Sequence, residues 1–333
     1  MIIGKQSISF ETPPYIRSYA SIVGQKEGDG PLGNYFDLIE KDPMLGAANW
    51  EQAESILQKK AALLALKKAG LQTEDIRYLF CGDLLGQLIA SSFGMLDLQI
   101  PMFGLYSACS TAGESLSLAA MSVAAGYAEH CLAVTSSHFA SAEKQFRYPL
   151  EYANQRPLST TWTVTGSGAF VVSTKGRVRI TGVTTGKMTD YGVKDSMNMG
   201  AAMAPAAADT IYAHFTDFDR SPEDYDLIVT GDLGVVGREL LLDLLKQKGY
   251  DLSKKHFDCG IAIFDDRTQD THSGGSGCGC SAVTLAAYLL PKLESGEFHR
   301  IFFMPTGALL STVSFNEGQS IPGICHGVVL EGK

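Results

Sequence analysis

Apolar and polar residues form two different patterns along the chain, one that predicts helices and one that predicts strands. Residues 50–69 carry apolar side chains at helical spacing, behind a capping pair formed by Asn49 and Gln52, and Gly70 follows as a helix stop. A second helix, rich in small residues, is expected over 110–125. Short apolar runs predict buried strands at 78–81, 102–106, 131–134 and 259–264.

Helices and strands therefore alternate, which is typical of an α/β protein with a parallel sheet covered by helices. His256 falls at the distal end of the strand expected at 259–264, so we interpret it as structural.

The second half of the chain repeats the order of the first. Residues 74–84 align without gaps on 223–233, and three shorter matches follow in the same order. These matches are Leu118 to Ala120 with Leu285 to Ala287, Gly126 with Gly296, and 168–172 with 327–330. The repeat predicts two related α/β halves, 1–175 and 176–333, around a pseudo-twofold axis. The carboxyl ends of their equivalent strands would then meet at one cleft, where parallel sheets bind ligands.

Composition narrows the class of protein. The 333 residues are 45% hydrophobic and 19% charged, which excludes intrinsic disorder. The net charge of −9 argues against a general nucleic-acid partner. Seven scattered cysteines indicate a reducing compartment rather than a disulfide framework. We expect no secretory signal and no transmembrane helix, because no positively charged segment precedes an apolar run and no run is long enough to span a bilayer.

Cys109 is the sharpest chemical candidate because it lies between a predicted strand and a predicted helix. Unpaired amides at a helix N-terminus favour a thiolate, which is the form that attacks acyl groups. The alternative is that Cys109 is a small buried apolar residue, as most free cysteines are.

Two aspartates occupy equivalent positions in the halves. Asp83 and Asp232 each follow a glycine that ends a predicted strand, so both carboxylates are expected to face the shared cleft. An aspartate in this position can instead bond its own backbone in a turn. The matched positions favour a site.

A glycine-rich stretch, 272–281, precedes the second-half equivalent of the helix behind Cys109. Its glycines, Gly274 and Gly275 among them, permit close backbone approach to a ligand, and His272 can exchange protons. A zinc site made by His272 with Cys278 and Cys280 is rejected because a fourth ligand is missing. We expect no metal site and no cofactor.

Four methionines gather with a run of alanines: Met188, Met197, Met199 and Met203. Ordinary core or interface packing is the favoured interpretation, and an adaptable apolar wall over a ligand is the alternative.

Two segments resemble those of the thiolase superfamily, which includes the condensing ketoacyl synthases: the strand-to-helix turn at 107–110, which contains Cys109, and the glycine-rich loop at 272–277. The resemblance covers nearly the whole chain. It implies a thiolase-like α/β fold in which two similar halves form a five-layered αβαβα core, and it implies a homodimer.

Four segments carry a closer resemblance, to a family of thiolase-like sporulation proteins: 81–85, 106–115, 199–207 and 272–281. This resemblance implies non-catalytic binding of dipicolinic acid (pyridine-2,6-dicarboxylate), or of its calcium chelate, for uptake into the developing spore. It further implies a peripheral protein of the spore inner membrane that works with membrane-embedded proteins of the same operon.

The chain departs from the condensing enzymes at two positions. Those enzymes carry a catalytic His where this chain has Asp232, and an Asn where it has Gly274 and Gly275. The carboxylate of Asp232 would disfavour a Cys109 thiolate by like charge. Cys109 is therefore expected to be a degenerate nucleophile position, with no catalytic residue in the chain.

The expected ligand-binding residues are Asp83, Cys109, Ser110, Asp232, His272, Gly274 and Gly275. Helix amides and the glycine-rich loop would donate to the carboxylates of the ligand, and calcium carried by the ligand would bridge to Asp83 or Asp232. Two alternatives remain. The first is an active thiolase or acyltransferase that uses Cys109 on an acyl-CoA, with His272 as base; the second is a scaffold for membrane partners.

Overall fold

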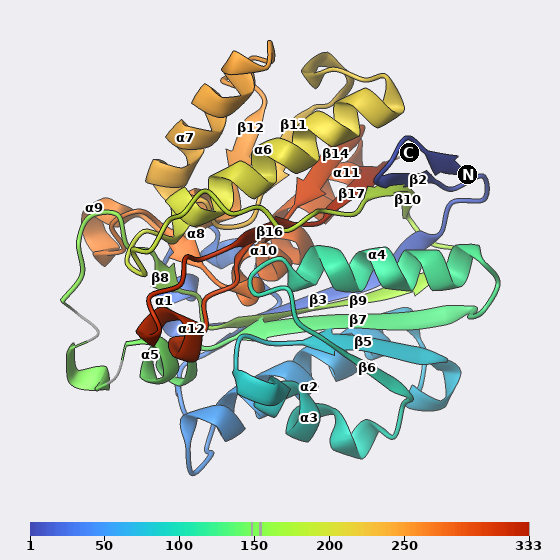
Figure 1. The fold of residues 1–333 in the computed structure, drawn as a ribbon. Coiled ribbons are helices and arrows are strands. Elements are labelled where there is room, and N and C mark those ends of the chain that lie inside the picture. The colour runs from blue at the N-terminus through green and yellow to red at the C-terminus, as the bar shows by residue number, and fades with distance from the viewer. Residues whose placement is uncertain (148, 153–154, 333) are drawn as a thin grey trace.

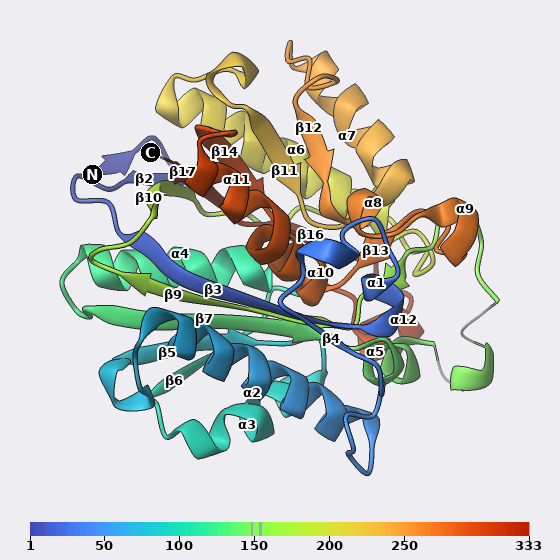
Figure 2. The ribbon, with the colours of Figure 1, turned by 180° about the vertical axis from the view of Figure 1, so that it is seen from behind.

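The computed structural model describes residues 1–147, 149–152 and 155–332, and its elements stack in five layers (Figures 1 and 2). The strands are β1 (Ile2–Ile3), β2 (Ser7–Ser9), β3 (Tyr15–Gly24), β4 (Leu38–Glu40), β5 (Tyr78–Gly82), β6 (Met102–Leu105), β7 (His130–Ser137), β8 (Trp162–Thr163), β9 (Gly166–Ser173), β10 (Val178–Thr184), β11 (Leu227–Thr230), β12 (His256–Asp258), β13 (Gly275–Ser276), β14 (Arg300–Met304), β15 (Thr306–Ala308), β16 (Gly323–Cys325) and β17 (Gly327–Glu331). The helices are α1 (Gln25–Gly28), α2 (Trp50–Ala69), α3 (Ile89–Met95), α4 (Thr111–Ala124), α5 (Phe139–Phe146), α6 (Met199–Phe218), α7 (Gly234–Gln247), α8 (Cys259–Ile263), α9 (Asp266–Gln269), α10 (Cys278–Thr284), α11 (Leu290–Ser295) and α12 (Thr312–Asn316).

The strand order reads the same from both ends of the large sheet. Its path is β12-β11-β14-β17-β10-β3-β9-β7-β5-β6, so each strand of the second half occupies the place of its partner in the first. Only two residue pairs join β10 to β3, Val178 with Ile16 and Arg179 with Tyr15. The sheet is therefore two five-stranded sheets that meet along one short edge, as a duplicated chain requires. The boundary between 175 and 176 falls between β9 and β10 and stays a prediction.

The middle layer is built by α4 and α10, which lie between the two sheets, with α2 and α3 on one outer face and α6 and α7 on the other (Figure 1). Small side chains make this layer possible. A Cβ added to Gly168 of β9 would lie 2.6 Å from the Cβ of Ala282 in α10, so neither position admits a larger residue. Leu116 of α4 and Val283 of α10 are fully buried, which places the core of the protein in this layer.

The helices predicted from periodicity are confirmed. The side chain of Asn49 accepts a hydrogen bond from the amide of Gln52 at 2.9 Å, and α2 ends at Gly70 in the left-handed conformation. The repeat extends to the helix stops, since Gly126 and Gly296 have φ values of 78° and 79°. Such values favour glycine, which has no Cβ to clash with the preceding carbonyl.

Two expectations about strands are wrong. The sheet is mixed rather than parallel, because β9 and β17 run antiparallel to their neighbours. β9 re-enters the sheet at the end where β7 stops, with Gly166 opposite Ser137, and an apolar run carries no signal of strand direction.

The expected strand at 259–264 is the short helix α8, and the strand before it, β12, contains His256. The carboxylate of Asp258 caps this helix by accepting from the amide of Ile261 at 3.0 Å. No helix in the described part of the chain combines the length and the apolar character that crossing a membrane requires.

Candidate functional site

The site is built on the turn between β6 and α4. Ala108 adopts a φ of 48°, which is uncommon for a residue with a Cβ. The hydroxyl of Thr111 holds the turn by donating to the carbonyl of Ala108 at 2.7 Å and accepting from the amide of Ser107 at 3.1 Å. The turn presents Cys109, which is partly exposed, whereas the other six cysteines are buried.

Cys109 opens into a cavity at the end of the middle layer. Apolar side chains form much of its wall: Leu84, Phe146, Met197, Met199, Met203 and Leu310. Polar and ionisable groups share the lining: Tyr106, Cys109, Glu143, Arg147, Thr160, Thr161, Thr163, Ser196, Asp232 and Ser276. Both halves contribute, so the convergence expected from the repeat is observed at this cavity.

Asp232 lies beside Cys109 in the cavity lining. It is fully buried, accepts from the hydroxyl of Thr306 at 2.7 Å and accepts from the amide of Gly277 at 3.0 Å. Burial raises the pKa of Asp232 to about 7, despite these hydrogen bonds. Although part of Cys109 is exposed to the cavity, protein surrounds its thiol, and this desolvation, followed by the charge of Asp232, raises the pKa of the thiol well above its ordinary value. Cys109 is therefore a neutral thiol at neutral pH, and its position at a helix N-terminus does not make it a thiolate.

Arg147, at the end of α5, is the only cation among the described residues that line the cavity. Its guanidinium is held by Glu143, which accepts from Nη2 at 2.6 Å and also from Nε. Glu143 further accepts from the hydroxyl of Thr163 at 3.0 Å. Nη1 reaches the sulfur of Met197 at 3.5 Å. Since each Nη carries two hydrogens, the guanidinium retains donors for a further acceptor.

Ser110 lies beside the cavity but does not line it. Its hydroxyl donates to the carbonyl of Pro305 at 2.7 Å and accepts from the amide of His326 at 2.9 Å. Ser107 contacts the ring of His326 at 3.2 Å. These bonds brace the Cys109 turn against the second half of the chain.

The structure does not bring Asp83 to the cavity. Its carboxylate accepts from the amides of Leu85 and Ser91 at 2.8 and 2.7 Å, and from the hydroxyl of Ser91 at 2.6 Å. Asp83 therefore acts as a turn residue, which was the alternative interpretation. Of the two matched aspartates, only Asp232 lines the cavity.

His272, Gly274 and Gly275 also lie outside the cavity lining. His272 directs Nδ1 to the carbonyl of Pro157 at 3.0 Å and Nε2 to Asp270 at 3.0 Å. Gly274 and Gly275 pack against the backbone of Gly260, and β13 pairs with β8. A Cβ at Gly274 would meet the backbone of Gly260, and one at Gly275 would meet the side chains of Ile263 and Val164, so the close approach is made within the protein itself.

Three of the four methionines line the cavity, which supports the alternative interpretation of that cluster; Met188 is exposed. Sequence reasoning missed Arg147, Glu143 and the hydroxyls at 160–163. A cation on a helix that ends beside the Cys109 turn has no local signature. The only signal in the sequence that could have pointed to Arg147 is the low number of cationic residues in this acidic chain.

Comparison with known proteins gives the family. A model of the stage V sporulation protein AD (SpoVAD) family matches residues 4–331. The chain belongs to this family. One relative is Stage V sporulation protein AD of Bacillus subtilis (strain 168), which is 46% identical over 331 residues, or 99% of this chain and 98% of the relative.

Solved structures similar to this member of the SpoVAD family are condensing enzymes. The tetronic acid condensing enzyme AbyA1 superposes with a TM-score of 0.58 at 16% identity, covering 95% of this chain and 99% of the enzyme. The 3-oxoacyl-[acyl-carrier-protein] synthase III of Aquifex aeolicus VF5 gives 0.57 at 14% identity, covering 96% and 99%. OleA of Xanthomonas campestris gives 0.55 at 15% identity, covering 99% and 98%. At these identities the likeness establishes the thiolase-like fold.

Proposed function

We propose that the cavity binds dipicolinic acid, free or as its calcium chelate, and that the protein serves the uptake of this compound into the developing spore. Membership of a sporulation family supports the biological setting. The observation that carries the ligand is the position of Arg147, the single cation in a cavity that otherwise has apolar walls, hydroxyl groups and two carboxyl groups, Glu143 and Asp232.

An aromatic dicarboxylate matches this lining. A guanidinium pairs with a carboxylate through two parallel hydrogen bonds, the strongest such arrangement that a side chain offers. Phe146 and the methionines supply an apolar surface for a flat ring. Thr160, Ser196 and Ser276 add hydroxyl donors for the second carboxylate.

Calcium would reach the site with its ligand. Among the described residues, no three side chains of the types that bind metals converge on one point. Dipicolinic acid chelates calcium through its ring nitrogen and both carboxylates. Because calcium takes six to eight oxygen-rich ligands, Asp232 is the cavity carboxylate placed to complete the coordination of a bound chelate.

We propose that binding is not accompanied by catalysis. The raised pKa of Cys109 disfavours the thiolate that acyl transfer needs, and His272, the base of the alternative, lies outside the cavity lining; both observations support this proposal. The acyltransferase alternative is tested by weighing the intact protein after incubation with acyl-CoA. An adduct that Cys109→Ser abolishes would overturn the non-catalytic proposal, and an unchanged mass supports it.

We further propose a homodimer across β6, and docking of the protein at the spore inner membrane through membrane-embedded products of the same operon. β6 is the outermost strand of its sheet, and its residues Met102 and Phe103 are 39% and 52% exposed. An uncharged edge strand with exposed apolar side chains is a template for pairing with another strand.

The test of ligand binding is isothermal titration calorimetry with dipicolinate, with and without calcium. Wild-type protein is compared with Arg147→Met, which we expect to weaken binding about 10- to 100-fold through loss of a charge-assisted pair. Arg177→Met is the matched control, because Arg177 forms an exposed ion pair with Glu294 away from the cavity.

The single variant leaves the buried carboxylate of Glu143 without its partner, so Arg147→Met combined with Glu143→Gln provides a second, charge-balanced version. Binding that both Arg147 variants retain would refute the assignment of Arg147. No binding by the wild-type protein in either titration would refute the proposed function and favour a scaffold.

A further inference from the structure

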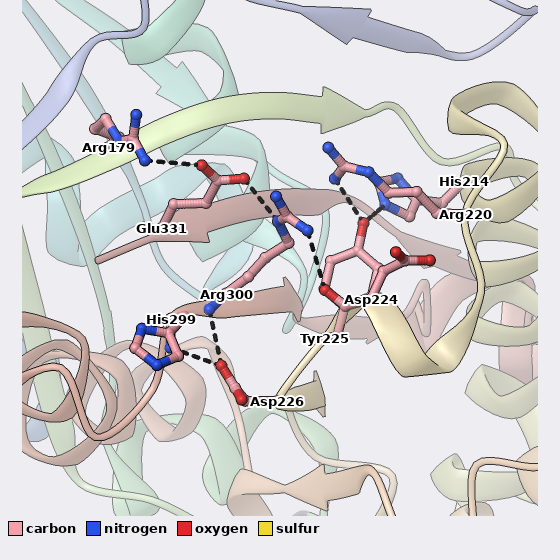
Figure 3. Close-up of polar contacts among 9 residues, drawn as sticks. All are labelled: Arg179, His214, Arg220, Asp224, Tyr225, Asp226, His299, Arg300 and Glu331. Atoms are coloured by element: carbon pink, nitrogen blue, oxygen red, sulfur yellow. Dashed lines mark hydrogen bonds and ion pairs between the residues drawn. The ribbon is translucent and has the colours of Figure 1, made fainter. Parts of the chain in front are cut away.

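A chain of hydrogen bonds runs from a cation to an anion at the opposite end of α6 from the cavity. Figure 3 shows its first part, where Arg220 and His214 converge on the hydroxyl of Tyr225. Nη1 of Arg220 donates to this hydroxyl at 2.9 Å, and Nε2 of His214 lies 2.5 Å from it. His214 is fully buried and its ring stacks on Phe302.

The chain continues from the other nitrogen of the His214 ring. Nδ1 lies 2.7 Å from the hydroxyl of Thr184 in β10, which lies 2.9 Å from the hydroxyl of Ser7 in β2. The hydroxyl of Ser7 donates to the carboxylate of Asp217 at 2.8 Å. Asp217 also accepts from the amides of Lys5 and Gln6, at 3.2 and 3.1 Å.

The carboxylate at one end of the chain and the neutral ring of His214 fix the direction of each hydrogen bond. A carboxylate only accepts hydrogen bonds, so the hydroxyl of Ser7 donates its single proton to Asp217. The same hydroxyl must therefore accept from Thr184. Thr184 must then accept from Nδ1–H of His214. At the other end a guanidinium only donates, so the hydroxyl of Tyr225 accepts from Arg220. The count from Asp217 therefore places the proton of His214 on Nδ1. Because burial lowers the pKa of His214 and keeps the ring neutral, Nε2 has no proton and accepts from the hydroxyl of Tyr225.

We propose that these six residues form a one-directional latch that holds the N-terminal hairpin, β1 and β2, on α6 and fixes His214 as the Nδ1–H tautomer. Two neighbouring contacts hold the latch in place. Arg300 donates to the carbonyl of Asp224 at 3.2 Å and to Glu331 at 2.7 Å, which immobilises the segment carrying Tyr225 (Figure 3). Gly4 approaches Asp217 so closely that an added Cβ would lie 1.7 Å from Oδ1.

The hairpin that the latch holds borders a surface groove. Residues Ile8 and Phe10 of the N-terminal segment form one wall of a surface groove, and Leu118 and Met121 of α4 form the other. Opening the hairpin would uncover this part of α4, the helix that begins at the Cys109 turn. The proposed latch does not depend on the identity of the ligand.

Nitrogen-15 NMR of the imidazole ring tests the tautomer in the wild-type protein. We expect His214 to be neutral, with a slowly exchanging proton on Nδ1, through the neutral pH range. A proton on Nε2, or an imidazolium, would overturn the proposal.

Hydrogen exchange of the Lys5 and Gln6 amides tests the latch itself. Thr184→Val removes one hydroxyl at nearly constant shape and should speed this exchange about tenfold or more. Thr216→Val is the matched control, because Thr216 is exposed on the same helix beside Asp217 and bonds only the carbonyl of Tyr212. Equal exchange in the two variants would overturn the latch.

A second pair of variants tests the contact between the hairpin and Asp217. Gly4→Ala and Gly46→Ala both place a Cβ at a positive φ, but only the first collides with a neighbour. We expect faster exchange of the hairpin amides in Gly4→Ala alone, and unchanged exchange there would contradict the proposed docking on Asp217.

Discussion

At the scale of single residues, Asp232 makes the charge of the cavity depend on pH. Its pKa of about 7 means that the carboxyl is mostly neutral below that pH and mostly ionised above it. Both carboxylates of dipicolinate are ionised throughout this range. An ionised Asp232 therefore repels the free ligand, whereas a protonated Asp232 does not.

We predict that affinity for free dipicolinate falls as the pH rises from about 6 to about 8, by roughly tenfold. Calorimetry at several pH values measures this slope. Asp232→Asn, which is neutral at every pH, should flatten it. A slope that persists in Asp232→Asn, or an affinity that increases with pH, would contradict the assigned role of Asp232.

A second buried acid, Glu54 of α2, links pH to stability. It accepts from the hydroxyls of Ser136 and Ser141 at 2.9 and 2.6 Å. Burial, and then the charge of Asp83, raise the pKa of Glu54 to about 8 from an ordinary value of 4.5. The folded protein keeps a proton that the unfolded chain releases between these values, so this contribution to stability is lost as the pH rises through the window.

We therefore predict that the free energy of unfolding falls by a few kcal/mol between about pH 5 and about pH 8. Urea titrations at each pH measure it. Glu54→Gln should reduce the fall, whereas Glu223→Gln, at an exposed position, should leave it unchanged. Parallel curves for Glu54→Gln and the wild type would show that Glu54 is ionised in the folded protein.

At the scale of elements, the sequence pattern predicted the helices and strands whose bounds are marked by neighbouring residues in the sequence. The capping pair and the stop at Gly70 delimit α2 within the sequence itself, and β5 is a continuous apolar run between polar residues. Patterning did not predict strand direction or the end of β12. The helical turn after Asp258 depends on side-chain capping and on Gly260 meeting the backbone of Gly275, which are tertiary contacts.

The proposed homodimer forms through the edge strand β6, so a substitution on this strand tests it. Phe103→Glu places a charge on the exposed side of the strand and should convert the dimer to a monomer in light scattering coupled to size exclusion. Leu240→Glu is the matched control, because Leu240 is 40% exposed on α7, which covers the outer face of the other sheet. A wild-type monomer, or a Phe103→Glu dimer, would refute pairing through this edge.

At the scale of the whole molecule, duplication explains what the sequence could predict about the site. The repeat predicted that the carboxyl ends of strands from both halves meet at one cleft; Cys109, after β6, and Asp232, after β11, both line the cavity. The same symmetry cannot predict side-chain direction. Asp83 turns toward Ser91, and the loop at His272 turns toward Pro157. Arg147 escaped detection because its place depends on how α5 packs beside a distant turn.

The contacts of Ser110 across the halves give a prediction about the whole fold. Ser110→Ala leaves a buried carbonyl and amide without their partner, which should cost about 1 to 3 kcal/mol of unfolding free energy. Calorimetric unfolding should remain a single transition at lower temperature, and dipicolinate affinity should be unchanged. An unchanged transition with weakened binding would instead make Ser110 a ligand contact.

The central claim is that the cavity between the halves holds an aromatic dicarboxylate. A crystal structure of the protein with dipicolinate tests it most directly. We predict electron density for the ligand beside Cys109, with one carboxylate on Arg147 and the ring against Phe146. Ligand density at another place, with this cavity filled only by solvent, would contradict the account.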